Sequence, residues 1–139
     1  MSEGIGAALR RKVRERADGV CEYCFMPDGE PTFPHEPDHI IAKKHGGRTL
    51  LANLAYACFE CNRAKGSDIA SYDKLTGELT PLYNPRQQNW SDHFHFKRAV
   101  IEPLTAVGRV TVALLKLNVP ARVEIRDNLM AAGAYPPTA

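Results

Sequence analysis

The spacing of apolar residues predicts a helix at the start of the chain and two more near its end. In the first twenty residues, apolar side chains recur at every fourth position, which puts them on one face of a helix over about residues 5–16. The positions concerned are Ile5, Leu9 and Val13. A second helix is predicted to begin near Thr105, and a third to run from about Ala121 to Ala132, where Gly133 ends it.

The middle of the chain has the pattern of short strands joined by turns. Residues 38–42, DHIIA, are suited to a short strand, and Gly46 with Gly47 supplies a turn after them. The run TLLANLAYAC at residues 49–58 is apolar enough to be buried, whereas residues 66–85 are polar and rich in turn signals. Helices at both ends with short strands between them indicate an α+β protein.

A further strand is predicted by alternation in the segment WSDHFHF, residues 90–96. His93 and His95 would share one face of that strand, but two histidines without a third ligand make a weak metal site, so we interpret the face as merely polar. Trp90, together with Arg86, is suited either to stacking on a nucleotide or to pinning the tail onto the core.

Length and composition indicate one folded domain. The 139 residues are 44% hydrophobic and 24% charged, which is typical of a chain that is neither disordered nor membrane-spanning. We predict a single domain over residues 1–139, in which residues from about 90 to 139 form a helical extension. No apolar run approaches the roughly 18 residues of a membrane span, and the N-terminus lacks the apolar core of a signal peptide. The expected location is the cytoplasm, and no membrane partner is expected.

The net charge of +2 is a weak argument for a polyanionic partner, but the distribution of the charges says more. One cluster lies in the first helix and comprises Arg10, Arg11, Lys12, Arg14 and Arg16. A second surrounds the motifs described below and comprises Lys43, Lys44, Arg48, Arg63 and Lys65. Such clusters bind phosphates locally, although the first is equally well explained as a solvated helix face.

The four cysteines form two C-x2-C pairs, Cys21/Cys24 and Cys58/Cys61, with none left over. Each pair makes a tight turn that aims two sulfurs at one point, and two such turns complete a tetrahedral site for Zn²⁺. The alternatives are redox-active dithiols and a rubredoxin-like iron site, since a reducing compartment argues against disulfides. Four thiolates leave a zinc ion no position for water, so the predicted ion is structural and any chemistry belongs to another site.

A second set of residues is suited to phosphodiester hydrolysis. His39 titrates near neutrality and can take a proton from water as a general base. Asp38 and Asn62 offer hard oxygen ligands for Mg²⁺ or a similar cation, which can neutralise charge on a scissile phosphate. Adjacent residues of a strand point to opposite faces, so Asp38 and His39 serve one site only if the strand is twisted or ends there.

The order of these pieces resembles the HNH endonuclease family in its zinc-stapled ββα-metal form. From Cys21 to Gly66 the chain carries C-x2-C, DHI, HGG, NL and C-x2-CN-x2-KG in succession. The resemblance implies an α+β fold with a treble-clef-like ββα-metal core over about residues 18–70. The four-cysteine zinc site would belong to this core, with a helix before it and the C-terminal helices after it.

The resemblance also implies a role for each motif residue. His39 stands at the position of the general base, Asp38 at that of the carboxylate that binds the catalytic metal, and Asn53 at that of the asparagine that orients the histidine. Asn53 is also suited to capping a following helix. Asn62 replaces the final histidine of the family, so the chain resembles an H-N-N variant whose neutral oxygen ligand favours Mg²⁺. Ala42 stands where proline is common, which concerns the rigidity of the loop.

The implied activity is metal-dependent cleavage of DNA, with Mg²⁺ or Mn²⁺ as the catalytic cofactor and Zn²⁺ as the structural one. Water deprotonated by His39 would attack the phosphorus and leave 5′-phosphate and 3′-hydroxyl ends. The cations expected to contact neighbouring phosphates are Arg63, Lys65, Lys43, Lys44 and Arg48. The alternative is a zinc-stapled module that binds nucleic acid without cutting it.

Overall fold

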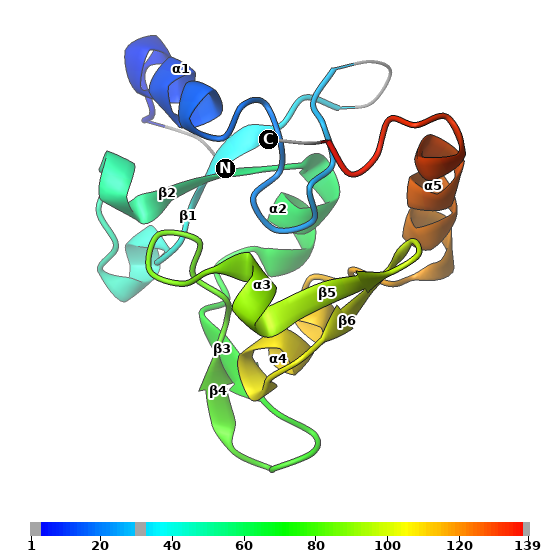
Figure 1. Cartoon of the computed structure of the whole chain (residues 1–139). Coiled ribbons are helices and arrows are strands. Elements are labelled where there is room, and N and C mark those ends of the chain that lie inside the picture. Colours follow the sequence, from blue (N-terminus) through cyan, green and yellow to red (C-terminus); the bar gives the residue numbers. More distant parts are fainter. Residues whose placement is uncertain (1–3, 30–32, 138–139) are drawn as a thin grey trace.

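The computed structural model describes residues 4–29 and 33–137 and has mixed helices and strands (Figure 1). Within the described residues the strands form three separate two-stranded antiparallel sheets, β1–β2, β3–β4 and β5–β6. The elements in chain order are α1 (Ala7–Arg16), β1 (Glu36–His39), η1 (Lys43–His45), η2 (Leu51–Asn53), β2 (Leu54–Ala57), α2 (Phe59–Lys65), β3 (Ala70–Tyr72), β4 (Leu79–Pro81), α3 (Trp90–His93), β5 (Phe94–Lys97), β6 (Val100–Pro103), α4 (Ala106–Leu114) and α5 (Pro120–Ala131).

The β1–β2–α2 unit has the ββα order that the resemblance implied. Asp38 lies opposite Ala55 and His39 opposite Leu54 in the antiparallel register. Helix α2 begins one residue after β2, and the sulfur of Cys58 accepts a hydrogen bond from the Cys61 amide at the helix start. Because β1 ends at His39, the strand does not force Asp38 and His39 onto opposite faces of a continuing sheet.

The three long helices predicted from the sequence are confirmed. In α1 the predicted apolar face packs on β2, and both Val13 and Leu54 are fully buried. Helix α4 begins after Thr105, whose hydroxyl accepts a hydrogen bond from the Gly108 amide at 3.1 Å. Helix α5 begins with Pro120 in its first turn, where the missing N–H costs no hydrogen bond.

The prediction of one strand over residues 90–96 is wrong in its first half. The segment folds as the short helix α3 and only then as β5. His93 therefore belongs to the helix and lies 2.7 Å from the Thr105 hydroxyl, whereas the exposed His95 lies 2.9 Å from a carboxylate oxygen of Glu102. The two histidines do not share a strand face.

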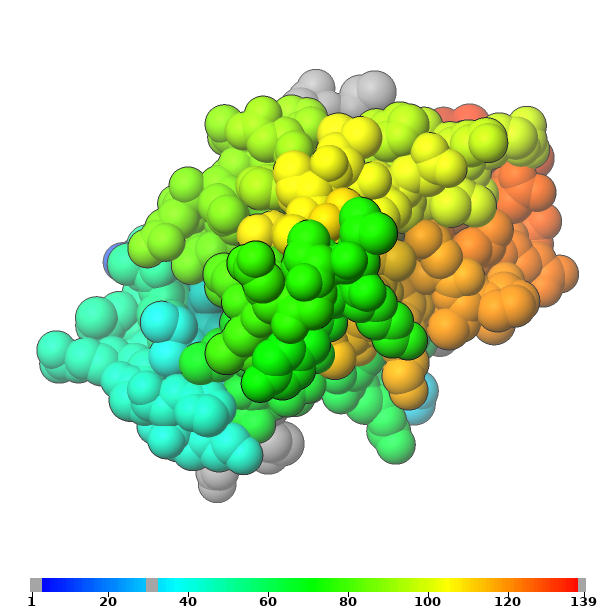
Figure 2. All heavy atoms as spheres, turned by 90° about the horizontal axis from the view of Figure 1, so that it is seen from below, coloured from blue at the N-terminus to red at the C-terminus, as the bar shows by residue number. Residues whose placement is uncertain are grey.

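The apolar run at residues 49–58 is buried only in its second half. Leu54 to Cys58 are buried in and next to β2, whereas Leu50 and Leu51 are exposed in the loop before it. The polar residues 66–85 contain the β3–β4 hairpin, which packs on α4. In Figure 2 the hairpin, in green, lies against the yellow and orange surface of the C-terminal part, and the loop around residues 43–48 projects at the left in cyan.

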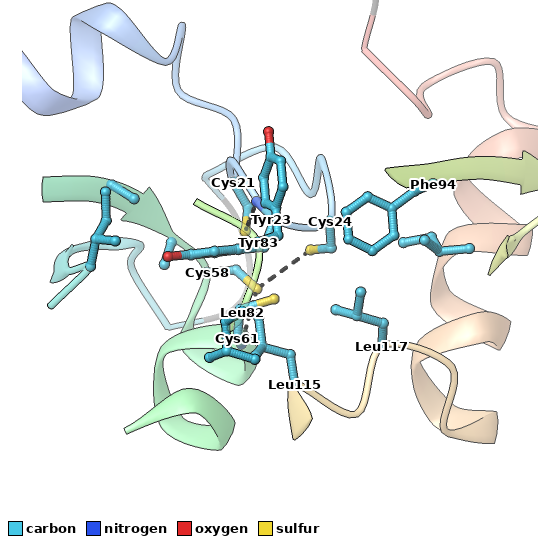
Figure 3. Close-up of a cluster of buried hydrophobic side chains, with 14 of the residues drawn as sticks. Cys21, Tyr23, Cys24, Cys58, Cys61, Leu82, Tyr83, Phe94, Leu115 and Leu117 are labelled. Atoms are coloured by element: carbon cyan, nitrogen blue, oxygen red, sulfur yellow. Dashed lines mark hydrogen bonds between the residues drawn. The ribbon is translucent and has the colours of Figure 1, made fainter. Parts of the chain in front are cut away.

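The largest buried cluster joins the cysteines to the C-terminal part of the chain (Figure 3). Phe94, Leu115 and Leu117 are almost fully buried in the same cluster as the sulfurs. The indole N–H of Trp90 donates to the Tyr23 carbonyl at 2.9 Å, and the Tyr135 hydroxyl donates to the Cys24 carbonyl. Of the two roles proposed for Trp90, the structure shows the anchor. Among the described helices, none is long and apolar enough to cross a membrane.

Candidate active site and metal centre

The two C-x2-C pairs converge on one point, as their spacing predicts. One ligand atom from each of the four cysteines lies within 4.8 Å of every other, and the sulfurs of Cys24 and Cys58 are 3.7 Å apart (Figure 3). The first pair comes from the turn after α1, and the second from the first turn of α2. All four side chains are buried, and none forms a disulfide. The cluster is thus a site of the kind that holds a structural zinc ion.

The surroundings of the sulfurs fit a divalent cation. The Tyr23 and Cys61 amides each point to a cysteine sulfur at 3.4 Å. Burial raises the pKa of the Cys21 thiol and of the Cys61 thiol, whereas hydrogen bonds from the other cysteines lower the pKa of Cys24. Buried thiols release their protons to solvent most readily when a metal cation binds and compensates the charge of the thiolates, so a closed tetrathiolate site fits these residues.

A separate pocket of about 340 Å³ brings together three residues of the predicted active site. Asp38 and His39 reach it from the end of β1, and Asn62 reaches it from α2. Ala42, Lys43, Gly66 and Ser67 complete its lining. Residues 23 positions apart in the sequence therefore share one polar hollow, because β1 and α2 pack together within the ββα unit.

The Asp38 carboxylate is buried and surrounded by donors. The Tyr23 hydroxyl donates to Oδ2 at 3.1 Å, and the Lys65 ammonium lies 3.1 Å from the same oxygen. The Asn62 side-chain amide lies 3.4 Å from Oδ1. Burial raises the pKa of Asp38, and Lys65 and Tyr23 act in the opposite direction. Tyr23 is not among the residues predicted for this site, because its place between Cys21 and Cys24 gives no sign that it faces Asp38.

His39 is held by the Thr49 hydroxyl, which no motif of the sequence indicates. Its Nε2 lies 2.9 Å from Oγ1 of Thr49, in the loop between Gly47 and η2. Burial and the nearby charge of Lys43 lower the pKa of His39, which favours the neutral imidazole. A neutral imidazole has a lone pair with which to accept a proton. The contact with Thr49 depends on how the loop folds back, which no local pattern reports.

Asn53 ties the loop after β1 to itself through its side chain. Its Oδ1 accepts from the Ile41 amide at 3.0 Å, and its Nδ2 donates to the carbonyls of Ile41 and Arg48 at 3.0 and 2.9 Å. Strand β2 follows Asn53, so the residue does not cap a longer helix. Gly47 is required in the same loop, since a Cβ there would lie 1.6 Å from the Ile41 carbonyl oxygen.

One segment of the chain matches a known family. It contains the two cysteine pairs, the loop held by Asn53 and the ββα unit. Residues 21–68 match the HNH endonuclease family model. The match begins at Cys21 and ends at Asp68, so the chain carries an HNH segment, and the resemblance is confirmed there. No curated protein and no solved structure matched the chain. The match associates residues 21–68 with nucleic acids.

Lys65, one of the cations predicted to contact DNA, is buried. Lys65 is only 2% exposed, and its ammonium contacts the Asp38 carboxylate and the His39 carbonyl. The prediction that Lys65 touches a phosphate is therefore corrected: α2 turns this side chain inward beneath the pocket. Lysine is rarely buried unless it is paired, which is why the sequence favoured the surface.

The remaining predicted cations of the HNH segment are exposed. Lys43 and Lys44 lie in η1, and Arg48 follows two residues after Gly46, all in the loop that projects beside the pocket. Arg63 is on the exposed side of α2, with its guanidinium carbon 5.7 Å from the centroid of the Phe59 ring. These four are accessible to a phosphate backbone.

The basic cluster of α1 is largely used within the chain. Arg14 pairs with Asp28 at 2.7 Å, and Arg16 donates to the carbonyls of Leu51 and Leu54. Arg10 donates to the Ile5 carbonyl at 3.2 Å. Arg86 likewise pairs with Glu22 and donates to the Leu54 carbonyl. Of the two roles predicted for this arginine, these contacts favour pinning the tail onto the core over stacking on a nucleotide.

Proposed function

We propose that this chain is a metal-dependent endonuclease that hydrolyses phosphodiester bonds of DNA at the pocket of Asp38, His39 and Asn62. The observation that carries the proposal is the convergence of these three side chains on one polar pocket inside the segment that matches the HNH endonuclease family. We further propose that Cys21, Cys24, Cys58 and Cys61 hold a structural Zn²⁺, which keeps β2 and α2 in register with the first cysteine turn.

Asp38 and Asn62 are suited to holding the catalytic cation. A carboxylate and an amide supply hard oxygens of the type that Mg²⁺ and Mn²⁺ prefer, and both side chains line the pocket. When bound there, the cation would neutralise negative charge on the phosphate and on the leaving oxygen. Tyr23 and Lys65 hold the Asp38 carboxylate from the protein side.

His39 is suited to act as the general base. It lines the pocket, and its Nε2 lies within hydrogen-bond distance of Thr49, which fixes the orientation of the ring. In the proposed reaction His39 takes a proton from water, and the water oxygen bonds to phosphorus as the bond to the 3′-oxygen breaks. The leaving 3′-oxygen gains a proton, which yields 5′-phosphate and 3′-hydroxyl ends. Asn53 acts through the loop and positions His39.

Exposed cations next to the pocket support a nucleic-acid substrate. Lys43, Lys44 and Arg48 belong to the loop that Asn53 clamps, and Lys43 also lines the pocket itself. Side chains of this type contact phosphates and position a strand without reading its sequence. Their placement beside the pocket would align a scissile phosphate with His39.

The test is a nicking assay on supercoiled DNA with Mg²⁺ or Mn²⁺. The His39→Ala protein is compared with the native chain and with His95→Ala, which replaces an exposed histidine far along the chain. We expect activity to fall at least a hundredfold in His39→Ala, because general-base catalysis contributes about that much or more, and to persist in His95→Ala. Zinc content and circular dichroism are measured on each sample.

Two outcomes would contradict the proposal. Equal nicking by His39→Ala and the native protein would remove the role of His39 as the base. DNA binding without metal-dependent nicking by the native protein would instead favour a zinc-stapled binding module. Linear and single-stranded DNA and RNA are assayed in parallel, since they define the preferred substrate.

A further inference from the structure

Arg122 of α5 reaches the cysteine cluster from outside the family-matched segment. Its Nη2 lies 3.1 Å from the sulfur of Cys61 and 3.8 Å from that of Cys58. The residue is 54 positions beyond Asp68, where the match to the HNH family ends. The C-terminal part of this chain thus adds a donor to a site whose four sulfur atoms all come from the HNH segment.

The guanidinium is held in place by a second set of contacts. Its Nη1 donates to the Leu115 carbonyl at 2.7 Å and to the Lys116 carbonyl at 3.2 Å, where α4 ends. A guanidinium is planar, so fixing one nitrogen on these carbonyls fixes the direction of the other toward the sulfurs. The contact with the cysteines is therefore a property of the docked α4–α5 corner and not of a freely rotating surface side chain.

The charge of Arg122 suits a tetrathiolate zinc site. Four thiolates and one Zn²⁺ carry two net negative charges, and burying net charge without a partner is costly. A cation that also donates hydrogen bonds to the sulfurs offsets part of that cost. Groups that bond to metal ligands from outside the coordination sphere commonly contribute to metal affinity.

Arg122 also lies beside a groove that reaches the cysteine cluster. A groove of about 510 Å³ runs between α2 and α5, and Cys58 and Arg122 both contribute to its lining. Cys58 is only 2% exposed, whereas Arg122 is half-buried. A chelator or an oxidant that enters this groove would reach a wall to which both Arg122 and Cys58 contribute.

We propose that Arg122 is a positioning and charge-compensating residue of the zinc site, and that it makes retention of the ion depend on the docking of α5. This inference rests on the proposed zinc site and is independent of DNA cleavage. It assigns a function to the C-terminal helices: they complete the surroundings of a metal centre whose ligands all lie in the HNH segment.

A purely structural role for Arg122 would be limited to capping the end of α4. That role predicts a loss of stability in Arg122 variants but no change in the sulfurs themselves. Spectra of the Co²⁺-substituted protein separate the two, because charge-transfer bands from thiolate to Co²⁺ report on the electron density of the sulfur. Removing donated hydrogen bonds raises that density, so we expect the bands of the variant to shift to lower energy.

The experiment measures the rate at which an excess of a chromophoric chelator takes zinc from the intact chain. Arg122→Gln is compared with Arg98→Gln, which removes an exposed arginine that pairs with Asp127 on the same helix α5. We expect Arg122→Gln to release zinc at least about tenfold faster than the native protein. We expect Arg98→Gln to release zinc at the native rate and to keep the native Co²⁺ spectrum.

A conservative variant keeps the test decisive if Arg122→Gln does not fold. Arg122→Lys keeps the charge without the planar fork, and we expect zinc release between the rates of the native protein and Arg122→Gln. Native zinc release and a native Co²⁺ spectrum in a folded Arg122 variant would overturn the role of Arg122 while leaving the zinc site intact. A native protein without one zinc per chain would overturn both proposals.

Discussion

The ammonium of Lys65 lies 3.1 Å from Oδ2 of Asp38 and 2.9 Å from the carbonyl oxygen of His39. Both charged side chains are almost fully buried, so this ion pair belongs to the interior of the pocket wall. The lysine thereby connects the last turn of α2 to the two final residues of β1. Burial raises the pKa of the Asp38 carboxyl, and the charge of Lys65 opposes that rise.

Replacing Lys65 by Met should destabilise the protein strongly. The change leaves the Asp38 carboxylate buried without its cation, which typically costs about 3–5 kcal/mol in the free energy of unfolding. Adding Mg²⁺ or Mn²⁺ should recover more stability in the variant than in the native protein, because a bound divalent cation replaces the lost charge. Denaturant unfolding with and without the metal measures both effects.

The matched control for Lys65→Met is Lys44→Met, which removes the same charge from an exposed position in η1. We expect its free energy of unfolding to change by less than about 1 kcal/mol. Equal losses in the two variants would contradict the importance of the buried pair.

Replacing Asn53 by Asp should loosen the loop beside the pocket. The variant keeps an oxygen for the Ile41 amide but loses both hydrogen bonds donated to the carbonyls of Ile41 and Arg48. Leaving such groups unpaired costs about 1–3 kcal/mol. We expect faster tryptic cleavage within residues 43–48 and weaker nicking, with the zinc content unchanged. Asn89→Asp, at an exposed residue whose side chain does not cap α3, provides the comparison and should be cut at the native rate.

Because of the pairing of Asp73 with Arg109, the free energy of unfolding should decrease as the pH falls into the acidic range. Both carboxylate oxygens accept from the guanidinium at 2.9 Å, which joins the β3–β4 hairpin to α4. Hydrogen bonds from Arg109 hold the pKa of Asp73 below its usual value. A lowered pKa contributes stability above the unfolded value of about 3.9, and that contribution disappears as the pH falls toward the folded value.

Thermal melts of the native protein and Asp73→Asn from pH 7 to pH 2 test this expectation. The native protein should melt at a higher temperature than the variant near neutrality, and the gap should narrow steadily as the pH falls below about 4. Asp68→Asn, at an exposed carboxylate, should show a small gap at every pH. A gap for Asp73→Asn that stays constant down to pH 2 would rule out the pair as its source.

The single tryptophan reports on the proposed zinc staple. Trp90 donates to the Tyr23 carbonyl between the first two cysteines, and its ring centroid lies 4.6 Å from that of Phe25. Removing zinc with a strong chelator should free the first cysteine turn and expose the indole. We expect the emission of Trp90 to shift to longer wavelength and to return when Zn²⁺ is restored. Unchanged emission in protein verified to be free of zinc would show that the turn keeps its shape without the ion.

The features that the sequence predicted well are those fixed by local spacing. The helix from Ala7 to Arg16 follows from apolar residues four positions apart. Helix α4 begins after Thr105, whose hydroxyl accepts a hydrogen bond from the amide of Gly108, only three positions further on. The cysteine cluster follows from two tight turns of known geometry. The strand prediction fails at the start of the segment 90–96. The alternation covers only residues 93–96, and a helical turn forms at Trp90.

The features that the sequence did not predict depend on where the folded chain brings distant residues together. Thr49 meets His39 only because the clamped loop returns toward β1. Lys65 turns inward because its ammonium contacts the carboxylate of Asp38, which lies 27 positions earlier in the sequence. Arg122 meets Cys61 across 61 positions. Each contact is a single polar pair between remote segments, and no periodicity within either segment encodes it.

Consecutive residues of α2 serve the two sites: Cys61 belongs to the sulfur cluster, and Asn62 to the pocket of Asp38 and His39. Successive residues of an α-helix are turned by about 100° around its axis, so the angle between the two sites is a fixed property of the backbone. A roll of α2 that spoiled the sulfur geometry would swing the Asn62 amide through the same arc. A displacement of α2 that the sulfur cluster does not tolerate therefore also disturbs the pocket of Asp38 and His39, and one residue inserted between positions 61 and 62 would change the angle between the two sites.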